Sequence, residues 1–166
     1  EERNFIYAQR DEILLSSDLT NRVEENNKEL IEEIYEDANG DEKRILEGLN
    51  SLYSTSFLPD DVKNKDEFEK KINSIIEAKK NYVGEEIFND YLRYIYLKNI
   101  DKRWVDHLDQ LEELRDAASL MSYAQKNPLV EYKNTASDAF DDMIGEITKA
   151  VCKAAVLVRF QINGPK

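Results

Sequence analysis

The side chains best suited to chemistry in this sequence are isolated from one another. His107 is the single histidine and Cys152 the single cysteine. Asp106 and Asp109 flank His107, but residues one or two apart on a helix point in different directions. Trp104 stands three residues before His107, where a di-iron Glu-x-x-His pair would need a glutamate. The pattern excludes a His–His metal pair and makes a catalytic pair of nucleophile and base improbable. It therefore predicts a chain without a catalytic or metal site.

Composition and the absence of phosphate-binding motifs point the same way. There is no Gly-x-x-x-x-Gly-Lys-Ser/Thr loop and no glycine-rich dinucleotide turn. The formal net charge of −12 would repel phosphate backbones, so nucleic acid is not expected as a partner. One cysteine excludes an internal disulfide and fits a reducing, cytoplasmic compartment. The chain contains no apolar run of membrane-spanning length and no signal-peptide pattern, and its start without Met suggests part of a longer polypeptide.

The hydrophobic spacing predicts an all-α fold. Hydrophobic residues make up 41% of the chain and charged residues 35%, with five glycines and three prolines in 166 residues. Ser16, Ser17 and Asp18 can cap a helix start, and Asn39-Gly40 can end a helix. The segment 54–64 is expected to be a loop with a short extended piece. Helices are expected at about 2–15, 19–37, 41–53, 65–82, 85–123 and 129–160.

The fifth of these helices is too long to be an ordinary core element. At about 1.5 Å per residue it would extend over more than about 50 Å, so we expect a strut. The last helix should lie back along the second half of the strut, and residues 1–15 should pack on the first half. Apolar residues recur along the strut at Ile87, Tyr91, Tyr94, Leu97, Ile100, Trp104, Leu108, Leu111, Leu114, Ala118 and Met121.

Three aromatic or ionisable residues of this helical pair have competing interpretations. His107 is either a packed residue hydrogen-bonded to a neighbouring helix, or a pH-sensing or catalytic group. Trp104 is either a packing anchor or a surface that stacks on a ligand. Tyr123, at the turn between the two helices, either closes the turn by packing on Pro128 or contacts another molecule.

The segment 100–133 carries a resemblance to a known family. It reads IDKRWVDHLDQLEELRDAASLMSYAQKNPLVEYK, and its Ile-Asp-x-x-Trp-x-x-His-Leu start and Tyr-Ala-Gln-Lys-Asn-Pro turn closely resemble SecA, the motor ATPase of bacterial protein export. Good matches cover about 1–15 and 83–145. Residues 16–82 match only in position and helical character.

The resemblance implies an identity for each part of the chain. Residues 1–15 would end the first scaffold helix, and 16–82 would be the helical wing domain. Residues 83–160 would form the rest of the helical scaffold with its two-helix finger, whose tip lies at about 121–128, and 161–166 would be a tail. In that family the finger enters the SecYEG channel and contacts unfolded preproteins, while the scaffold packs on and restrains the other domains of the motor.

The resemblance also implies residue roles. At the tip, Tyr123 would contact the preprotein and the channel, together with Met121, Ser122, Gln125 and Lys126. The resemblance also assigns structural roles in the scaffold to Trp104, His107, Leu108, Arg115, Pro128 and Tyr132. The sequence departs from the family pattern where a basic residue is missing beside the tip, where Asn127 replaces an aspartate, and where Ser137 replaces a phenylalanine.

These expectations describe a non-enzymatic part of a larger machine. ATP and magnesium would bind the longer protein, and this chain would hold no cofactor and no metal. The machine would be cytoplasmic and peripheral at the cytoplasmic face of the inner membrane. Self-association through exposed apolar scaffold surface is a further expectation. The alternative is a stand-alone helical interaction module, such as a dimerising stalk.

Overall fold

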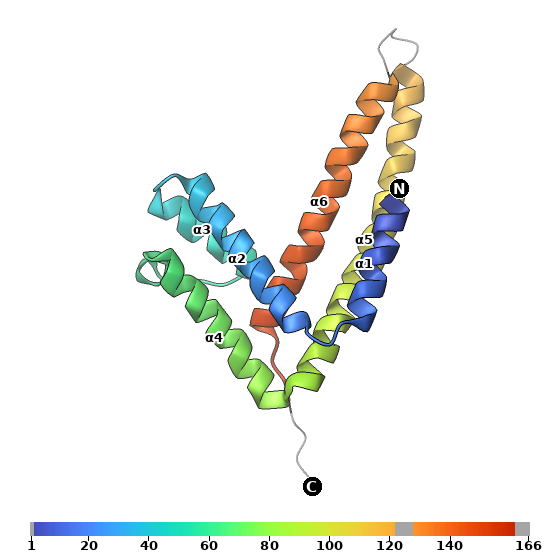
Figure 1. The fold of residues 1–166 in the computed structure, drawn as a ribbon. Helices are drawn as coiled ribbons and strands as arrows, with labels where there is room; N and C mark the ends of the chain where they lie inside the picture. Colours follow the sequence, from blue (N-terminus) through green and yellow to red (C-terminus); the bar gives the residue numbers. More distant parts are fainter. Residues whose placement is uncertain (1, 122–127, 162–166) are drawn as a thin grey trace.

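Helices account for nearly all of the described chain. The computed structural model describes residues 2–121 and 128–161, with side chains described for 2–120 and 133–161. In Figure 1 α5 and α6 form a long antiparallel hairpin, α1 lies along α5, and α2, α3 and α4 form a bundle beside the lower half of the hairpin. The helices are α1 (Glu2–Leu15), α2 (Leu19–Ala38), α3 (Glu42–Tyr53), the 3-10 helix η1 (Pro59–Val62), α4 (Lys65–Val83), α5 (Glu85–Met121) and α6 (Pro128–Leu157).

The helix ends follow from local side-chain chemistry. The Asp18 carboxylate accepts a hydrogen bond from the Asn21 backbone N–H at 3.2 Å, and Asp41 caps α3 in the same way. Asn39 ends α2 in the left-handed region, at φ 49°. Gly84 separates α4 from α5 at φ 95°, where a β-carbon would be strained. The caps predicted at Asp18 and at Asn39 are confirmed.

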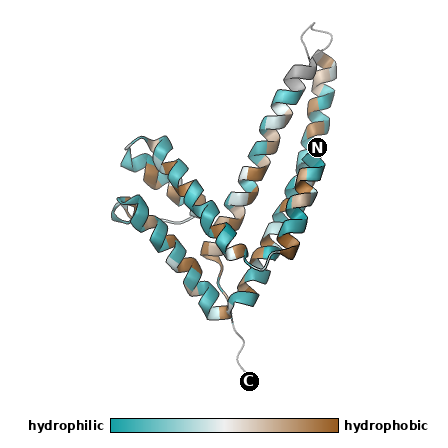
Figure 2. Ribbon diagram, in the orientation of Figure 1, coloured by the Kyte–Doolittle hydropathy of each residue, from teal (hydrophilic) through white to brown (hydrophobic). Residues whose placement is uncertain are grey.

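Most of the helices share one core. Buried apolar residues from all six α-helices form one cluster, and Figure 2 marks the hydrophobic positions along each helix. The buried apolar residues include Ile45, Leu49 and Leu52 in α3, and Phe68, Ile72 and Ile76 in α4. The helical fold class predicted from the sequence is confirmed, whereas the division into domains stays a prediction.

The first half of α5 faces the core differently from the prediction. Ile87 and Tyr94 are each 58% exposed, so their place in the predicted stripe was wrong, whereas Tyr91, Leu97 and Ile100 of the stripe do pack in the core. The core instead receives Phe88, Leu92 and Tyr96. Leu108, also placed in the stripe, is largely exposed. This helix has apolar residues on two faces, and spacing alone could not show which face packs.

Two further expectations are corrected. The segment after α3 contains the short helix η1, and no strand occurs in the parts of the chain that the structure describes. The last helix, with the residues that follow it, covers more than the second half of α5. Phe160 packs edge-on against Tyr91 at a centroid distance of 5.4 Å and against Phe88 at 6.1 Å, both in the first half of α5.

Candidate functional site

The α5–α6 hairpin carries the residues singled out by sequence. α5 ends at Met121 and α6 begins at Pro128, so the helix boundaries agree with a turn between them. The tip residues Tyr123, Ser122, Gln125 and Lys126 lie outside the described residues, and so do the side chains of Met121, Pro128 and Tyr132. The described part of the site is therefore the region where α1 begins alongside α5; beyond this region the hairpin projects alone (Figure 1), and we call the region its base.

Three helices meet at this base around His107. The His107 ring lies 5.5 Å from the Trp104 ring on α5 and 5.6 Å from the Phe140 ring on α6. Phe5 of α1 packs edge-on against Phe140 at 5.7 Å. We call Phe5, Trp104, His107 and Phe140 the base cluster. Rings at these separations attract one another beyond their buried area, so the cluster holds α1, α5 and α6 together.

His107 is bound on one side by a carboxylate. It is 2% exposed, and its Nε2 lies 3.0 Å from Oε1 of Glu2 on α1. Of the two interpretations left open by the sequence, this geometry agrees with a packed histidine that is hydrogen-bonded to a neighbouring helix. Its Nδ1 is buried and has no hydrogen-bond partner among the described residues. Trp104 packs partly buried against the core, as an anchor would, while Leu108 and Arg115 face solvent.

A second set of contacts fixes the elbow between α1 and α2. Asn89 of α5 is buried, and its Oδ1 accepts the Leu19 backbone N–H at 2.6 Å while its Nδ2 donates to the Ser16 carbonyl at 3.1 Å. Arg93 donates to the same carbonyl from Nη2 at 2.6 Å and to the Ile13 carbonyl from Nε at 3.3 Å. Backbone groups freed by the break in the helix thus find partners on α5.

The sequence analysis missed Asn89 and Arg93. The signal available was a polar residue, Asn89, directly after the core position Phe88 in a helix rich in apolar residues. A buried amide at such a position has to satisfy its hydrogen bonds, and an interruption in a neighbouring helix is a common place to do so. Which interrupted helix the Asn89 amide meets depends on how α1 packs on α5.

A lysine ties the bundle to the end of α6. Lys79 of α4 donates from Nζ to the carbonyl of Val158 at 2.7 Å and also to the carbonyl of Val156. These carbonyls lie at the carboxyl end of α6, where a cation also complements the helix dipole. Burial, followed by the nearby charge of Arg159, lowers the pKa of Lys79 below its ordinary value.

Two neighbouring acidic side chains of the bundle have pKa values that are shifted in opposite directions. Burial raises the pKa of Glu24 on α2 to about 7, and its hydrogen bond to Glu77 on α4 adds to the rise. Glu77 receives that hydrogen bond and also contacts Lys80, and its pKa is lowered. Below about pH 7 the proton is therefore favoured on Glu24, whose carboxyl group can then donate to Glu77 and link α2 to α4.

Across residues 2–121 and 128–161, no group of three or more His, Cys, Asp or Glu side chains is placed to hold a metal ion. Over the same residues, none of the helices combines the length and apolarity needed to cross a bilayer. Cys152 is buried, and burial raises the pKa of its thiol to about 12, which leaves little of the nucleophilic thiolate.

The fold is an antiparallel helical hairpin that a third helix holds at its base and that a helical bundle flanks. This is the architecture of a helical scaffold protein. The profile of the family described as "SecA Wing and Scaffold domain" matches residues 1–159. The chain belongs to this SecA wing and scaffold family, which confirms the resemblance found in the sequence.

Known relatives agree over nearly the whole chain. Protein translocase subunit SecA of Treponema denticola is 36% identical over 180 aligned residues, which cover 98% of this chain and 19% of that protein. The SecA of Borreliella burgdorferi strain ZS7 is 33% identical over 175 residues, which cover 98% of this chain and 19% of that protein. The SecA of Brachyspira hyodysenteriae is 37% identical over 146 residues, covering 80% of this chain and 15% of that protein. The chain thus spans about a fifth of the length of the relatives it matches.

Proposed function

We propose that this chain is a non-catalytic part of a SecA-like, ATP-driven protein translocation motor. The observation that carries the proposal is the family match over residues 1–159, which includes the whole described hairpin and its base. The motor would use SecYEG and unfolded preproteins as partners and would work at the cytoplasmic face of the inner membrane. ATP and magnesium would bind elsewhere in the longer protein.

Within that motor, the α5–α6 hairpin would be the finger. Its proposed task is to reach the channel and the moving preprotein with Tyr123, flanked by Met121, Ser122, Gln125 and Lys126. An aromatic side chain offers apolar area and a hydroxyl at low cost in conformational entropy, so it can contact chains of many sequences. The base cluster and the elbow contacts at Asn89 support this role, because a finger can transmit force only from a fixed base.

The tip is tested by substitution in the full-length protein. Tyr123→Ala should reduce preprotein transport into membrane vesicles at least about tenfold, while Tyr123→Phe should retain most of it. Tyr82→Ala, which removes an exposed tyrosine from α4, serves as the matched control. Circular dichroism of each variant checks that the helices remain. Unchanged transport with Tyr123→Ala would contradict the role of the tip.

The outer face of α5 suggests how the scaffold meets the rest of the motor. Ile87, Tyr94, Val105 and Leu108 are exposed along this helix. Exposed apolar stripes commonly mark interfaces. We propose that other domains of the longer protein cover this stripe and that the isolated chain self-associates through it. Light scattering should show concentration-dependent association, reduced in Ile87→Ser/Val105→Ser. A strict monomer at millimolar concentration would count against this part of the proposal.

A further inference from the structure

The residues that follow α6 cross back over the start of α5. Helix α6 ends at Leu157, and residues 158–160 continue from it without helical structure. Phe160 packs edge-on against Tyr91 and Phe88, at ring-centroid distances of 5.4 and 6.1 Å. In Figure 1 this segment descends from the end of α6 towards the place where α4 meets α5. We call residues 158–160 the strap.

The connection between α4 and α5 is thinly packed. Ile76 and Phe88 are fully buried, but none of the residues between them is buried. We call this stretch, residues 77–87, the joint. Within it Val83 packs partly buried against the core, and Gly84 lies at φ 95° where a β-carbon would meet nothing within 4 Å. A stretch with so few buried contacts opens more easily than the core on either side of it.

Two anchors tie the strap to both helices that the joint connects. On α4, Lys79 donates from Nζ to the carbonyl of Val158 at 2.7 Å and to the carbonyl of Val156. On α5, Phe88 packs against the Phe160 ring. Lys79 belongs to the joint and Phe88 follows it directly. Withdrawal of the strap therefore removes contacts from α4 and α5 at the same time.

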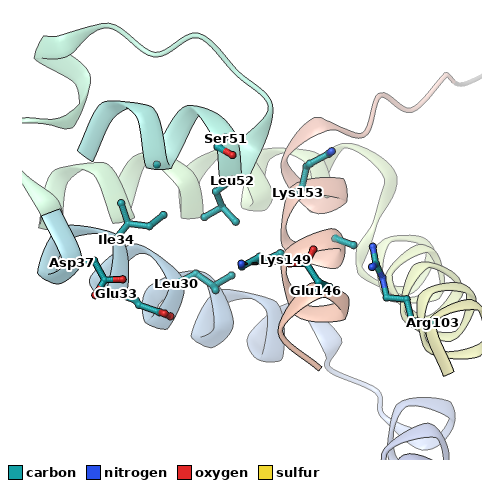
Figure 3. Close-up of a pocket in the computed structure, with 12 residues that line it drawn as sticks. Leu30, Glu33, Ile34, Asp37, Ser51, Leu52, Arg103, Glu146, Lys149 and Lys153 are labelled. Carbon is teal, nitrogen blue, oxygen red and sulfur yellow. Dashed lines mark ion pairs between the residues drawn. The ribbon is translucent and has the colours of Figure 1, made fainter. Parts of the chain in front are cut away.

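The core is held together at other places. The Cys152 Sγ of α6 lies 3.9 Å from the Val23 carbonyl of α2, and both residues are fully buried. A cavity of about 450 Å³ lies between the bundle and the hairpin, and the described residues that line it come from α2, α3, α5 and α6 (Figure 3). The α4 anchor at Lys79 is separate from the contact between α2 and α6, so the strap can leave while the core stays closed.

We propose that the strap opens and closes independently of the core and that its closure holds the joint rigid. In the closed state Phe160 covers Phe88, and Lys79 caps the end of α6. In the open state the end of α6 and the last turns of α4 lose their shared contacts, and the joint flexes at Gly84. Coupling between two sites is reciprocal, so loosening the joint also releases the strap. Any load that draws the strap away from α5 thus loosens the joint without unfolding the core.

Backbone amides give separate readouts of the joint and the strap. The Gly84 N–H donates to the Lys80 carbonyl at 2.8 Å, and the Phe88 N–H donates to the Gly84 carbonyl at 3.0 Å, so these two amides report opening of the joint. The Val158 N–H donates to the Ala154 carbonyl at 2.9 Å and reports opening of the strap. Hydrogen exchange measured by NMR follows all three, and amides inside α2 and α3 serve as the reference for the core.

Phe160→Ala tests the effect of the strap on the joint. Exchange at Gly84 and Phe88 should become about tenfold faster, because the open state no longer has to expose the Phe160 ring. In the wild-type chain, exchange at these two amides should depend only weakly on added urea, since a local opening exposes little surface. The core amides should depend on urea strongly.

Phe57→Ala is the matched control. Phe57 is also partly buried and packs edge-on against Phe68 at 5.0 Å, but its contacts lie within the bundle, away from the strap. This substitution should accelerate exchange of the core amides and leave Gly84 and Phe88 at their wild-type rates. The pair of variants therefore separates a local opening from unfolding of the whole core.

Gly84→Ala tests the effect of the joint on the strap. The added β-carbon meets no other atom but strains the backbone at positive φ, and opening of the joint relieves that strain. Exchange at Val158 should rise at least about fivefold. Gly40→Ala is the control, because Gly40 lies at φ 86° in equally open surroundings after the end of α2. It should leave exchange at Val158 unchanged.

Three results would overturn the proposal. The first is unchanged exchange at Gly84 and Phe88 in Phe160→Ala. The second is equal acceleration of these amides by Phe57→Ala, which would mean that they exchange only when the core unfolds. The third is an equal effect of Gly84→Ala and Gly40→Ala on Val158, which would mean that the joint and the strap are not coupled.

Discussion

The Nε2 atom of His107 lies 3.0 Å from a carboxylate oxygen of Glu2, which joins the middle of α5 to the first turn of α1. The His107 side chain is 1% exposed and the Glu2 side chain 33% exposed, so solvent screens this contact less than it screens a surface pair. The contact lies beside the rings of Trp104 and Phe140. This polar pair within an aromatic cluster is one of the contacts that hold α1 on α5, together with the ion pair between Arg10 and Asp101 at 3.0 Å.

Replacing His107 should weaken the base of the hairpin. His107→Ala removes a buried ring and leaves the Glu2 carboxylate without this partner, so we expect the free energy of unfolding to fall by about 2–3 kcal/mol. Urea unfolding followed by circular dichroism measures the change. Asp109→Ala, on the exposed side of the same helix, is the control and should change it by less than about 0.5 kcal/mol. Equal effects of the two substitutions would show that the pair contributes little.

Sequence reasoning found the histidine but not its partner. A lone polar residue beside an apolar stripe predicts burial, and His107 is buried. Glu2 stands 105 residues away in the chain, on a helix whose register against α5 no local pattern encodes. The contact of Phe140 with His107 depends on the register of α6 against α5 in the same way. Residue types determined the kind of contact, and the packing of three helices decided which residues make it.

The register of α5 shows where periodicity fails. Ile87 and Tyr94 continue the spacing of the later apolar residues, but they face outward, and the nearby Phe88 and Tyr96 are buried. Because α5 is apolar on two faces, the period identifies a helix without identifying its buried side. The role of Tyr123 stays a prediction that rests on the family pattern.

Asn89→Ala should loosen the elbow between α1 and α2. The substitution removes two hydrogen bonds, to the Leu19 N–H and the Ser16 carbonyl, and leaves these groups without their amide partner. A loss of about 2 kcal/mol in the free energy of unfolding is expected, with faster hydrogen exchange at Leu19. Asn81→Ala, at an exposed site on α4, should change neither measurement. If Leu19 exchange stays at the wild-type rate in Asn89→Ala, the amide does not fix the elbow.

Glu24 should make stability depend on pH. Its folded pKa of about 7 lies above its ordinary value of 4.5, so the folded state binds this proton more tightly than the unfolded state. The resulting stabilisation is complete below about pH 4.5 and is lost as the pH rises through 7. Because the group is partly exposed and Glu77 opposes the effect, we expect a loss of about 1 kcal/mol.

The variant Glu24→Gln should remove that loss, since an amide can donate to Glu77 at any pH. Urea unfolding at pH 5 and at pH 8 gives the free energy of unfolding of each protein at both pH values, and the difference between them is compared. The neighbouring exposed Glu25→Gln should retain the wild-type difference. A Glu24→Gln chain whose stability falls as much as that of the wild type between these pH values would rule out Glu24 as the source.

Cys152 should report global opening of the core. Its side chain is fully buried, its Sγ lies 3.9 Å from the Val23 carbonyl, and the pKa of the thiol is raised to about 12. At pH 8 a disulfide reagent should therefore react with the folded chain at least about a hundredfold more slowly than with the urea-unfolded chain. Ser137→Cys adds an exposed thiol on α6 and should react at the unfolded rate without urea. Rapid reaction of native Cys152 would mean that α2 and α6 separate readily.

Lys79→Met should release the end of α6 from the bundle. Methionine retains most of the apolar stem but cannot donate to the carbonyls of Val156 and Val158, which then lose a cationic partner at the negative end of the helix dipole. The expected cost is about 1–3 kcal/mol in the free energy of unfolding, and amide exchange in the last turn of α6 should accelerate. Lys70→Met, at an exposed position on the same helix α4, should leave both unchanged. The decisive comparison is the exchange rate. If Lys79→Met lowers stability while exchange in the last turn of α6 stays at the wild-type rate, the lysine acts through packing of its stem and not by capping α6.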